Sequence, residues 1–185
     1  DAVGQTLQGE GVHGDGGKSA QYRGQWQQGH WFLPFHQRTT RWSAMVCHRR
    51  AGKTVACIND LLRSALTTQR EDWLGAYIAP YFGQAKDVAW AYLKKFASVV
   101  PGVQFSEVEL RADFPNGSRI RLYGADNADV RLRGIYLDDV VLDEYADFAP
   151  QIWGEVIRPL LADRQGRAVF IGTPKGHNSF YRIFN

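Results

Sequence analysis

The sequence predicts an α/β domain whose mostly parallel central sheet is flanked by helices and carries a β-hairpin. Three observations support this fold class. Short apolar runs alternate with stretches of helical periodicity, the apolar runs are continuous in the manner of buried parallel strands, and an Asn-Gly pair separates two alternating segments. The composition, with 44% hydrophobic and 22% charged residues in 185, is that of a soluble globular protein.

The elements follow from local pattern along the chain. Continuous apolar runs bounded by polar or turn residues predict buried strands, and apolar residues three and four apart predict helices. The expected strands cover residues 42–46, 73–79, 140–142 and 168–172, and the expected helices cover 54–66, 85–99, 153–161 and 180–184.

Residues 108–123 predict the hairpin, with a turn at Pro115-Asn116-Gly117. Because side chains alternate between the faces of a strand, the apolar residues of the first arm are expected on one face. These residues are Val108, Leu110, Ala112 and Phe114, with Ile120 and Leu122 on the second arm.

Residues 1–30 are rich in Gly and Gln and predict a loosely packed arm, followed by a folded domain over 31–185. Within the arm, residues 14–19 end like a phosphate-binding loop, but no strand precedes them. We expect the chain to be part of a longer protein, because it starts at Asp1 rather than Met. No apolar run reaches 18 residues, so no membrane span is predicted.

Charge and cysteine content restrict the function only weakly. The net charge of +3 is compatible with a polyanionic partner. Cys47 and Cys57 are the two cysteines, and they form neither a disulfide framework nor a metal-binding spacing. A reducing compartment is therefore expected.

Residues 47–54, Cys-His-Arg-Arg-Ala-Gly-Lys-Thr, match the phosphate-loop pattern G-x-x-x-x-G-K-[ST] with Cys in place of the first Gly. A predicted strand precedes them and a predicted helix follows, so backbone N–H groups and the positive helix end should surround an anion. Lys53 is expected to contact the β- and γ-phosphates of ATP, and Thr54 to hold Mg²⁺. The expected ATP-binding loop comprises Cys47, His48, Arg49, Arg50, Ala51, Gly52, Lys53 and Thr54.

Three further segments next to predicted strands contain residues of the kinds that take part in phosphate chemistry. Asp143 and Glu144 follow the apolar run 140–142, where Asp143 is expected to hold Mg²⁺ and Glu144 to activate water. This pair, together with the loop, predicts a P-loop NTPase of the ASCE type. Thr173 follows strand 168–172 and is expected to sense the γ-phosphate, and Arg133 is a candidate arginine finger.

Together these motifs resemble the ATPase domain of the terminase large subunit of tailed bacteriophages. The resemblance covers residues 32–185 and includes the loop, Leu132-Arg133-Gly134, the strand ending in Asp143-Glu144, residues 153–159 and residues 170–176. Loops that deviate at the first position are common in that family, so Cys47 does not weaken the match.

The resemblance implies a role for several residues. Arg49 matches a loop arginine that contacts phosphate, Arg133 matches a finger directed at the neighbouring subunit's nucleotide, and Thr173 matches the coupling motif. The family also has an adenine-contacting glutamine upstream of the loop, for which Gln37 and Gln28 are the candidates.

The resemblance also implies a function: ATP hydrolysis that powers translocation of double-stranded DNA into a viral procapsid. The implied partners are the portal protein, the small terminase subunit and further copies of the chain in a ring, a pentamer, working in the host cell cytoplasm. The nuclease domain of such proteins is absent from this chain, so we expect ATPase activity without DNA cleavage.

Two other functions remain open. A superfamily 2 helicase would also carry Asp-Glu after a strand, but it requires a second RecA-like domain for which the chain is too short. A nucleotide-binding scaffold that does not hydrolyse ATP would have no requirement for Glu144.

Overall fold

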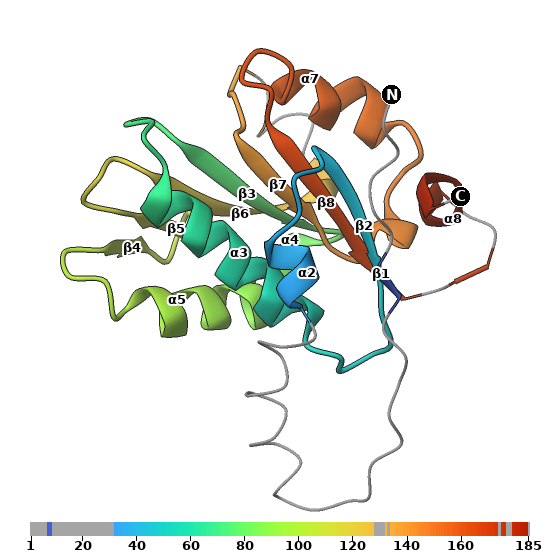
Figure 1. Cartoon of the computed structure of the whole chain (residues 1–185), viewed down its shortest axis with the longest axis horizontal. Coiled ribbons are helices and arrows are strands. Elements are labelled where there is room, and N and C mark those ends of the chain that lie inside the picture. The colour runs from blue at the N-terminus through green and yellow to red at the C-terminus, as the bar shows by residue number, and fades with distance from the viewer. Residues whose placement is uncertain are drawn as a thin grey trace, which may run out of the picture.

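The computed structural model describes residues 7–8, 32–127, 132, 134–173, 175–176 and 179–184, and these form one sheet with helices on both faces (Figure 1). The strands are β1 (Leu7–Gln8), β2 (Trp42–Val46), β3 (Leu74–Ala79), β4 (Gln104–Ser106), β5 (Arg111–Asp113), β6 (Arg119–Gly124), β7 (Asp139–Leu142) and β8 (Arg167–Gly172). The α-helices are α2 (Leu33–His36), α3 (Lys53–Thr67), α4 (Phe82–Gln84), α5 (Ala91–Ala97), α7 (Arg158–Leu160) and α8 (Ser179–Phe184).

The order of the strands in the sheet is β1-β2-β8-β7-β3-β6-β5-β4 among the described residues. All neighbours pair in parallel except β6 with β5 and β5 with β4. The predicted fold class is therefore confirmed, and β8 lies between β2 and β7.

The sheet topology brings three chain segments to one edge. Because β2, β8 and β7 are parallel, their carboxyl ends lie together, with Val46 opposite Gly172 and Leu142 opposite Phe170. In open α/β sheets, ligands bind at this carboxyl edge. The loop after β2, the residues after β7 and the residue after β8 are thus the positions where a site is expected.

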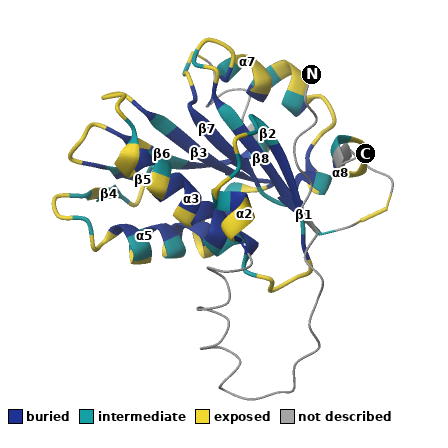
Figure 2. Cartoon of the chain, viewed as in Figure 1, coloured by how far each residue is buried: buried dark blue, intermediate teal, exposed yellow. Residues whose placement is uncertain are grey.

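A separate apolar core covers each face of the sheet. Val141 packs with α3 and α5 on one face, while Val140 and Leu142 face the other, as the two-residue period of a strand requires. Figure 2 shows the central strands buried and the outer helix surfaces exposed. The apolar runs of the sequence are continuous because both faces are covered.

Two predicted helices differ in detail from the structure. The helix expected over 85–99 begins at Phe82, ends at Ala97 and contains a π-helical segment, Ala85–Trp90. The helix expected over 153–161 begins with a second π-helical segment, Trp153–Ile157, and continues as α7. Pro159 has no amide hydrogen to donate there, and the helix ends at the next residue.

The hairpin is confirmed, but its first arm is shorter than predicted. β5 pairs antiparallel with β6, and Ala112 lies opposite Ile120. Val108, expected on the buried face, is instead 88% exposed. The backbone of Leu110 has a φ of 48°, which interrupts the extended conformation and starts the strand only at Arg111.

Most of the predicted arm, residues 1–30, lies outside the described residues, as does the loop-like segment 14–19. Its described part, Leu7–Gln8, pairs with Met45 and Val46 at the edge of the sheet. Among the described residues, no helix combines the length and the apolar character needed to cross a membrane. Both cysteines are buried and unbridged.

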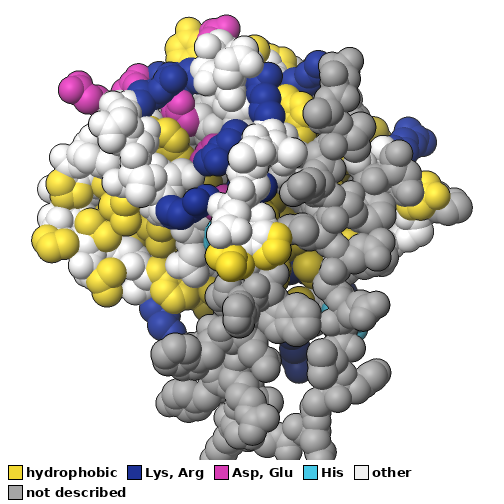
Figure 3. All heavy atoms as spheres, in the orientation of Figure 1, with side chains coloured by type: hydrophobic (Ala, Val, Ile, Leu, Met, Phe, Trp, Pro, Cys, Tyr) yellow, Lys and Arg dark blue, Asp and Glu magenta, His cyan; other side chains and the backbone are white. Residues whose placement is uncertain are grey.

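Hydrophobic side chains are exposed near α5 and β4. Val88, Val99 and Val108 are 47%, 79% and 88% exposed, respectively. Figure 3 shows hydrophobic side chains gathered on the side of the molecule that carries these elements.

Candidate nucleotide site

The loop between β2 and α3 has the backbone of an anion-binding turn. The Cys47 amide donates to the Gly172 carbonyl (3.3 Å) and fastens the start of the loop to the end of β8. Arg50 and Gly52 have φ values of 63° and 90°, so the chain turns sharply before α3 begins at Lys53. The first N–H groups of α3 therefore end the loop, where a helix terminus favours negative charge.

Cationic side chains surround this turn. Arg49 and Arg50 are exposed, and neither pairs with an acidic side chain of the described residues. Lys53 is only 7% exposed, and its ammonium donates to Oε1 of Glu144 at 3.2 Å. The loop thus presents one buried and two exposed cations to a ligand at the helix end.

Glu144 connects the loop to the end of β8. Its second carboxylate oxygen, Oε2, accepts hydrogen bonds from the Thr173 hydroxyl (3.2 Å) and the Thr173 amide (3.4 Å). The backbone of Glu144 has φ 48° and ψ 47°, a left-handed conformation that costs a non-glycine residue about 1 kcal/mol or more. Such strain often occurs at functional residues, and here it places the carboxylate between Lys53 and Thr173.

Asp143 lies beside Glu144 at the end of β7 and is mostly buried. Its Oδ2 accepts a hydrogen bond of 2.5 Å from the hydroxyl of Tyr77 on β3. Burial raises the pKa of Asp143, while the Tyr77 hydrogen bond opposes that rise. Burial and the Asp143 charge also raise the pKa of Tyr77 well above 10, so the phenol remains a donor.

The side-chain oxygens of Thr54 and Asp143 fit a magnesium ion, which needs few protein ligands, better than they fit a metal ion bound only by protein side chains. Thr54 lies near enough to the Tyr77 hydroxyl to oppose the burial-driven rise in its pKa, and the same hydroxyl binds Asp143, so Thr54 and Asp143 are in the same neighbourhood. The described residues contain no group of three or more His, Cys, Asp or Glu arranged for a metal. Magnesium usually takes one or two protein oxygens and completes its shell with phosphates and water.

The remaining predicted site residues are Arg133, Gln28 and Gln37, and only Gln37 lies within the described residues. Arg133 and Gln28 lie outside the described residues. Gln37 is exposed and directly follows α2. Its two neighbours in the sequence, His36 and Arg38, contact Asp60, which lies two turns into α3. Gln37 is therefore beside the middle of α3, and its predicted contact with adenine stays a prediction.

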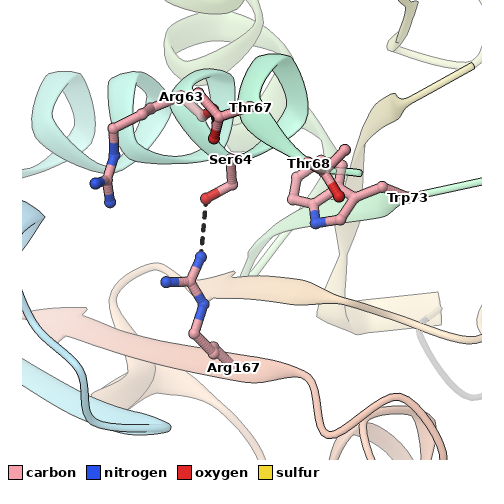
Figure 4. A pocket seen from close by; sticks show the side chains of 6 residues that line it. All are labelled: Arg63, Ser64, Thr67, Thr68, Trp73 and Arg167. Atoms are coloured by element: carbon pink, nitrogen blue, oxygen red, sulfur yellow. Dashed lines mark hydrogen bonds between the residues drawn. The ribbon is translucent and has the colours of Figure 1, made fainter. Parts of the chain in front are cut away.

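A cavity of about 250 Å³ lies at the opposite end of α3 (Figure 4). Roughly 20 Å of helix separates it from the loop. Its two arginines are already compensated, Arg63 by Asp60 and Arg167 by Asp139 and Ser64. It therefore lacks the unpaired positive charge of the loop. It is lined by Arg63, Ser64, Thr67, Thr68, Trp73 and Arg167.

Sequence reasoning missed Tyr77 and the contacts of Asp60. Tyr77 falls within a predicted apolar strand, although a fully buried tyrosine normally requires a partner for its hydroxyl. Asp60 lies on α3 with Cys57, Ile58, Leu61 and Leu62 close to it in sequence, and a charged residue among apolar ones signals a buried ion pair. Its partner Arg38 is 2.6 Å away, and both side chains are 4% exposed.

The chain matches one protein family over most of its length. A family model described as the N-terminal part of the terminase large subunit, T4likevirus-type, matches residues 46–185. The terminase large subunit of Thermus virus P23-45 is 31% identical over 172 residues, covering 82% of this chain and 35% of that protein. The chain thus spans about a third of the length of the curated relatives it matches.

Solved structures agree with the fold. The large terminase ATPase domain of Thermus phage P74-26 is 31% identical with a TM-score of 0.69, covering 81% of this chain and 66% of that one. The large terminase of another thermophilic bacteriophage, in complex with ATP-gamma-S, is 15% identical with a TM-score of 0.61. That match covers 83% of this chain and 38% of the other, and at this identity it supports the fold alone.

Proposed function

This chain belongs to the N-terminal family of terminase large subunits, and on that premise we propose that it hydrolyses ATP to drive double-stranded DNA into a viral procapsid. One observation carries the proposal: Glu144 lies in direct contact with Lys53 of the loop and Thr173 after β8. A glutamate held between a phosphate-binding lysine and a neighbouring strand end is placed to act on the terminal phosphate and to respond to its loss.

We assign the phosphates to the loop. The N–H groups at the start of α3, the ammonium of Lys53 and the guanidinium of Arg49 supply the positive charge. His48, Arg50 and the other residues of 47–54 complete the loop. We propose a nucleotide as the ligand because residues 47–54 match the phosphate-loop pattern and the chain belongs to a terminase family.

Thr54 and Asp143 would hold Mg²⁺ through their oxygens. Magnesium, when bound, neutralises charge on the β- and γ-phosphates. Glu144 acts as the general base that orients a water molecule and accepts its proton. Thr173 contacts the same carboxylate, so a change in the position of Glu144 is transmitted directly to the residue after β8.

The same charges explain how ligand binding affects Glu144. A phosphate at Lys53 competes with the carboxylate for the ammonium, because both acceptors are anionic. Binding of ATP therefore weakens one of the two contacts of Glu144 and leaves the contact with Thr173. We propose that this exchange is the first step by which nucleotide state reaches the DNA-moving parts of the motor.

The remaining parts of the proposal rest on family membership. Arg133 is proposed to complete the site of a neighbouring subunit, in a ring, a pentamer, that docks on a portal protein with the small terminase subunit. The domain responsible is residues 31–185, and the proposed location is the host cell cytoplasm on the procapsid. No nuclease activity is assigned to this chain.

Phosphate release measured at increasing protein concentration, with and without duplex DNA, tests the function. We expect Mg²⁺-dependent ATP hydrolysis whose rate per subunit rises with concentration. Lys53→Met should abolish nucleotide binding and hydrolysis, whereas Lys86→Met, at an exposed lysine of the first π-helical segment, should change neither. Nucleotide binding without any hydrolysis in the assembled protein would support a scaffold instead.

A further inference from the structure

Tyr77 makes a polar contact in the centre of the sheet that the roles assigned so far do not explain. It lies on β3 opposite Val141 of β7 and is fully buried. Asp143 is two residues beyond Val141, so its side chain and that of Tyr77 are on the same face of the sheet. The Tyr77 hydroxyl reaches across the strands and donates to Oδ2 of Asp143 at 2.5 Å.

The start of α3 lies near the same hydroxyl. Thr54, one residue after the loop lysine, is close enough to the Tyr77 oxygen to oppose the burial-driven rise in the pKa of the phenol. One phenol therefore binds Asp143 and lies near Thr54, two oxygen-bearing side chains that come from different elements, 89 positions apart in the chain (143 minus 54). These are the two side chains to which the proposed function assigns magnesium.

We propose that Tyr77 is a positioning residue for the magnesium site, holding the Asp143 carboxylate beside Thr54 in the arrangement that the metal requires. This inference rests on the proposed function. A carboxylate has about four lone-pair positions, and the Tyr77 bond occupies one of them and fixes the rotation of the group. Outer hydrogen-bond partners of this kind typically change metal affinity by about 10–100-fold.

A purely structural role for Tyr77 would make its hydroxyl dispensable. The ring fills the core between β3 and α3, and a phenylalanine would fill the same space. The hydroxyl, in contrast, meets a mostly buried carboxylate that would otherwise lose a hydrogen-bond donor. The hydrogen bond from this hydroxyl to Asp143 is the feature that a core residue does not need.

Tyr77→Phe removes only the hydroxyl, and Tyr145→Phe is its matched control. Tyr145 is also buried, at 2% exposure, but it packs in the core on the opposite face and makes no side-chain hydrogen bond among the described residues. Both variants are compared with the wild type by thermal unfolding. Binding of fluorescent ADP is then titrated at increasing free Mg²⁺, starting from an EDTA-treated sample, and Mn²⁺ binding is followed by electron paramagnetic resonance.

We expect Tyr77→Phe to bind ADP without Mg²⁺ as the wild type does. The Mg²⁺ concentration that half-maximally tightens ADP binding should rise about tenfold or more, with a matching loss of Mn²⁺ affinity. Tyr145→Phe should follow the wild-type curve. A wild-type Mg²⁺ dependence in Tyr77→Phe would overturn the proposal, as would an equal loss of ADP affinity with and without metal.

If Tyr77→Phe does not fold, the double variant Asp143→Ala/Tyr77→Phe provides a second test. In an Asp143→Ala background no carboxylate is left without its donor, and the Tyr77 substitution should then add nothing to the Mg²⁺ dependence. A further shift in the double variant would show that Tyr77 does not act through Asp143. A wild-type protein that binds ADP with no response to Mg²⁺ would instead remove the proposed function on which this inference rests.

Discussion

Replacing Glu144 with glutamine separates its two proposed actions, catalysis and competition for Lys53. Glutamine has nearly the same size and retains an oxygen that accepts a hydrogen bond, but it carries no charge. The variant should lose the general base and, at the same time, free the Lys53 ammonium for phosphate. Turnover and nucleotide affinity are therefore expected to change in opposite directions.

The contacts of Glu144 determine the expected size of the changes in turnover and in ATP affinity. Loss of a general base lowers turnover about 10²- to 10⁴-fold. The Lys53–Glu144 pair is 3.2 Å long, with side chains 9% and 20% exposed, so it is mostly shielded from water. A hydrogen bond to a charged group contributes about 1.5–3 kcal/mol net, and glutamine retains part of it. If the contact of Lys53 with residue 144 is weakened by about 1.4 kcal/mol, a phosphate replaces it more easily and ATP binding tightens about tenfold.

The assay pairs phosphate release with calorimetric titration of a slowly hydrolysed ATP analogue. Glu155→Gln, at an exposed glutamate of the second π-helical segment, is the matched control and should leave both measurements unchanged. If Glu144→Gln turns over within tenfold of the wild type, Glu144 is not the base. If its nucleotide affinity is no tighter than that of the wild type, the Lys53 contact does not compete with phosphate.

Thr173→Val removes the hydroxyl that donates to Glu144, and we expect a roughly tenfold loss of turnover with ADP affinity retained. An equal loss of affinity, measured by the same titrations, would mean that the residue supports the loop instead. Burial raises the pKa of Asp60, but hydrogen bonds from His36 and Arg38 outweigh it and hold that pKa well below its usual range. This contribution to stability is full above about pH 4 and is lost as the pH falls further. Asp60→Asn should therefore cost about 3 kcal/mol in urea unfolding at pH 7 and flatten the acid dependence, whereas an unchanged unfolding midpoint would contradict the buried pair.

The parts of the fold that local pattern determines were predictable. β2, α3, β7 and β8 follow from apolar runs and helical periodicity, and the hairpin follows from Asn116-Gly117. The prediction for Val108 is wrong because the left-handed backbone at Leu110, which no local pattern reveals, delays the start of β5. The pairing of Leu7–Gln8 with β2 also depends on distant contacts.

The candidate site shows the same division between local and distant information. The motifs predict which residues gather at the carboxyl edge, since the order of strands in this fold brings the loop, Glu144 and Thr173 together. The direct contact of Lys53 with Glu144 depends on the left-handed backbone at position 144. The partner of Tyr77, Asp143, could not be identified because it is set by the register between β3 and β7.

The position of β8 has a consequence for how the domain is made. Among the described residues β8 is the last strand along the chain, yet it lies between β2 and β7, and the only other strand paired with β2 there is the two-residue β1. Non-local strand pairing of this kind forms late, after its loop-closure entropy has been overcome. The loop precedes β8 along the chain and therefore cannot meet Thr173 until β8 has entered the sheet. We expect the loop, Glu144 and Thr173 to come together only when β8 inserts, so a chain that ends before β8 should not form the site.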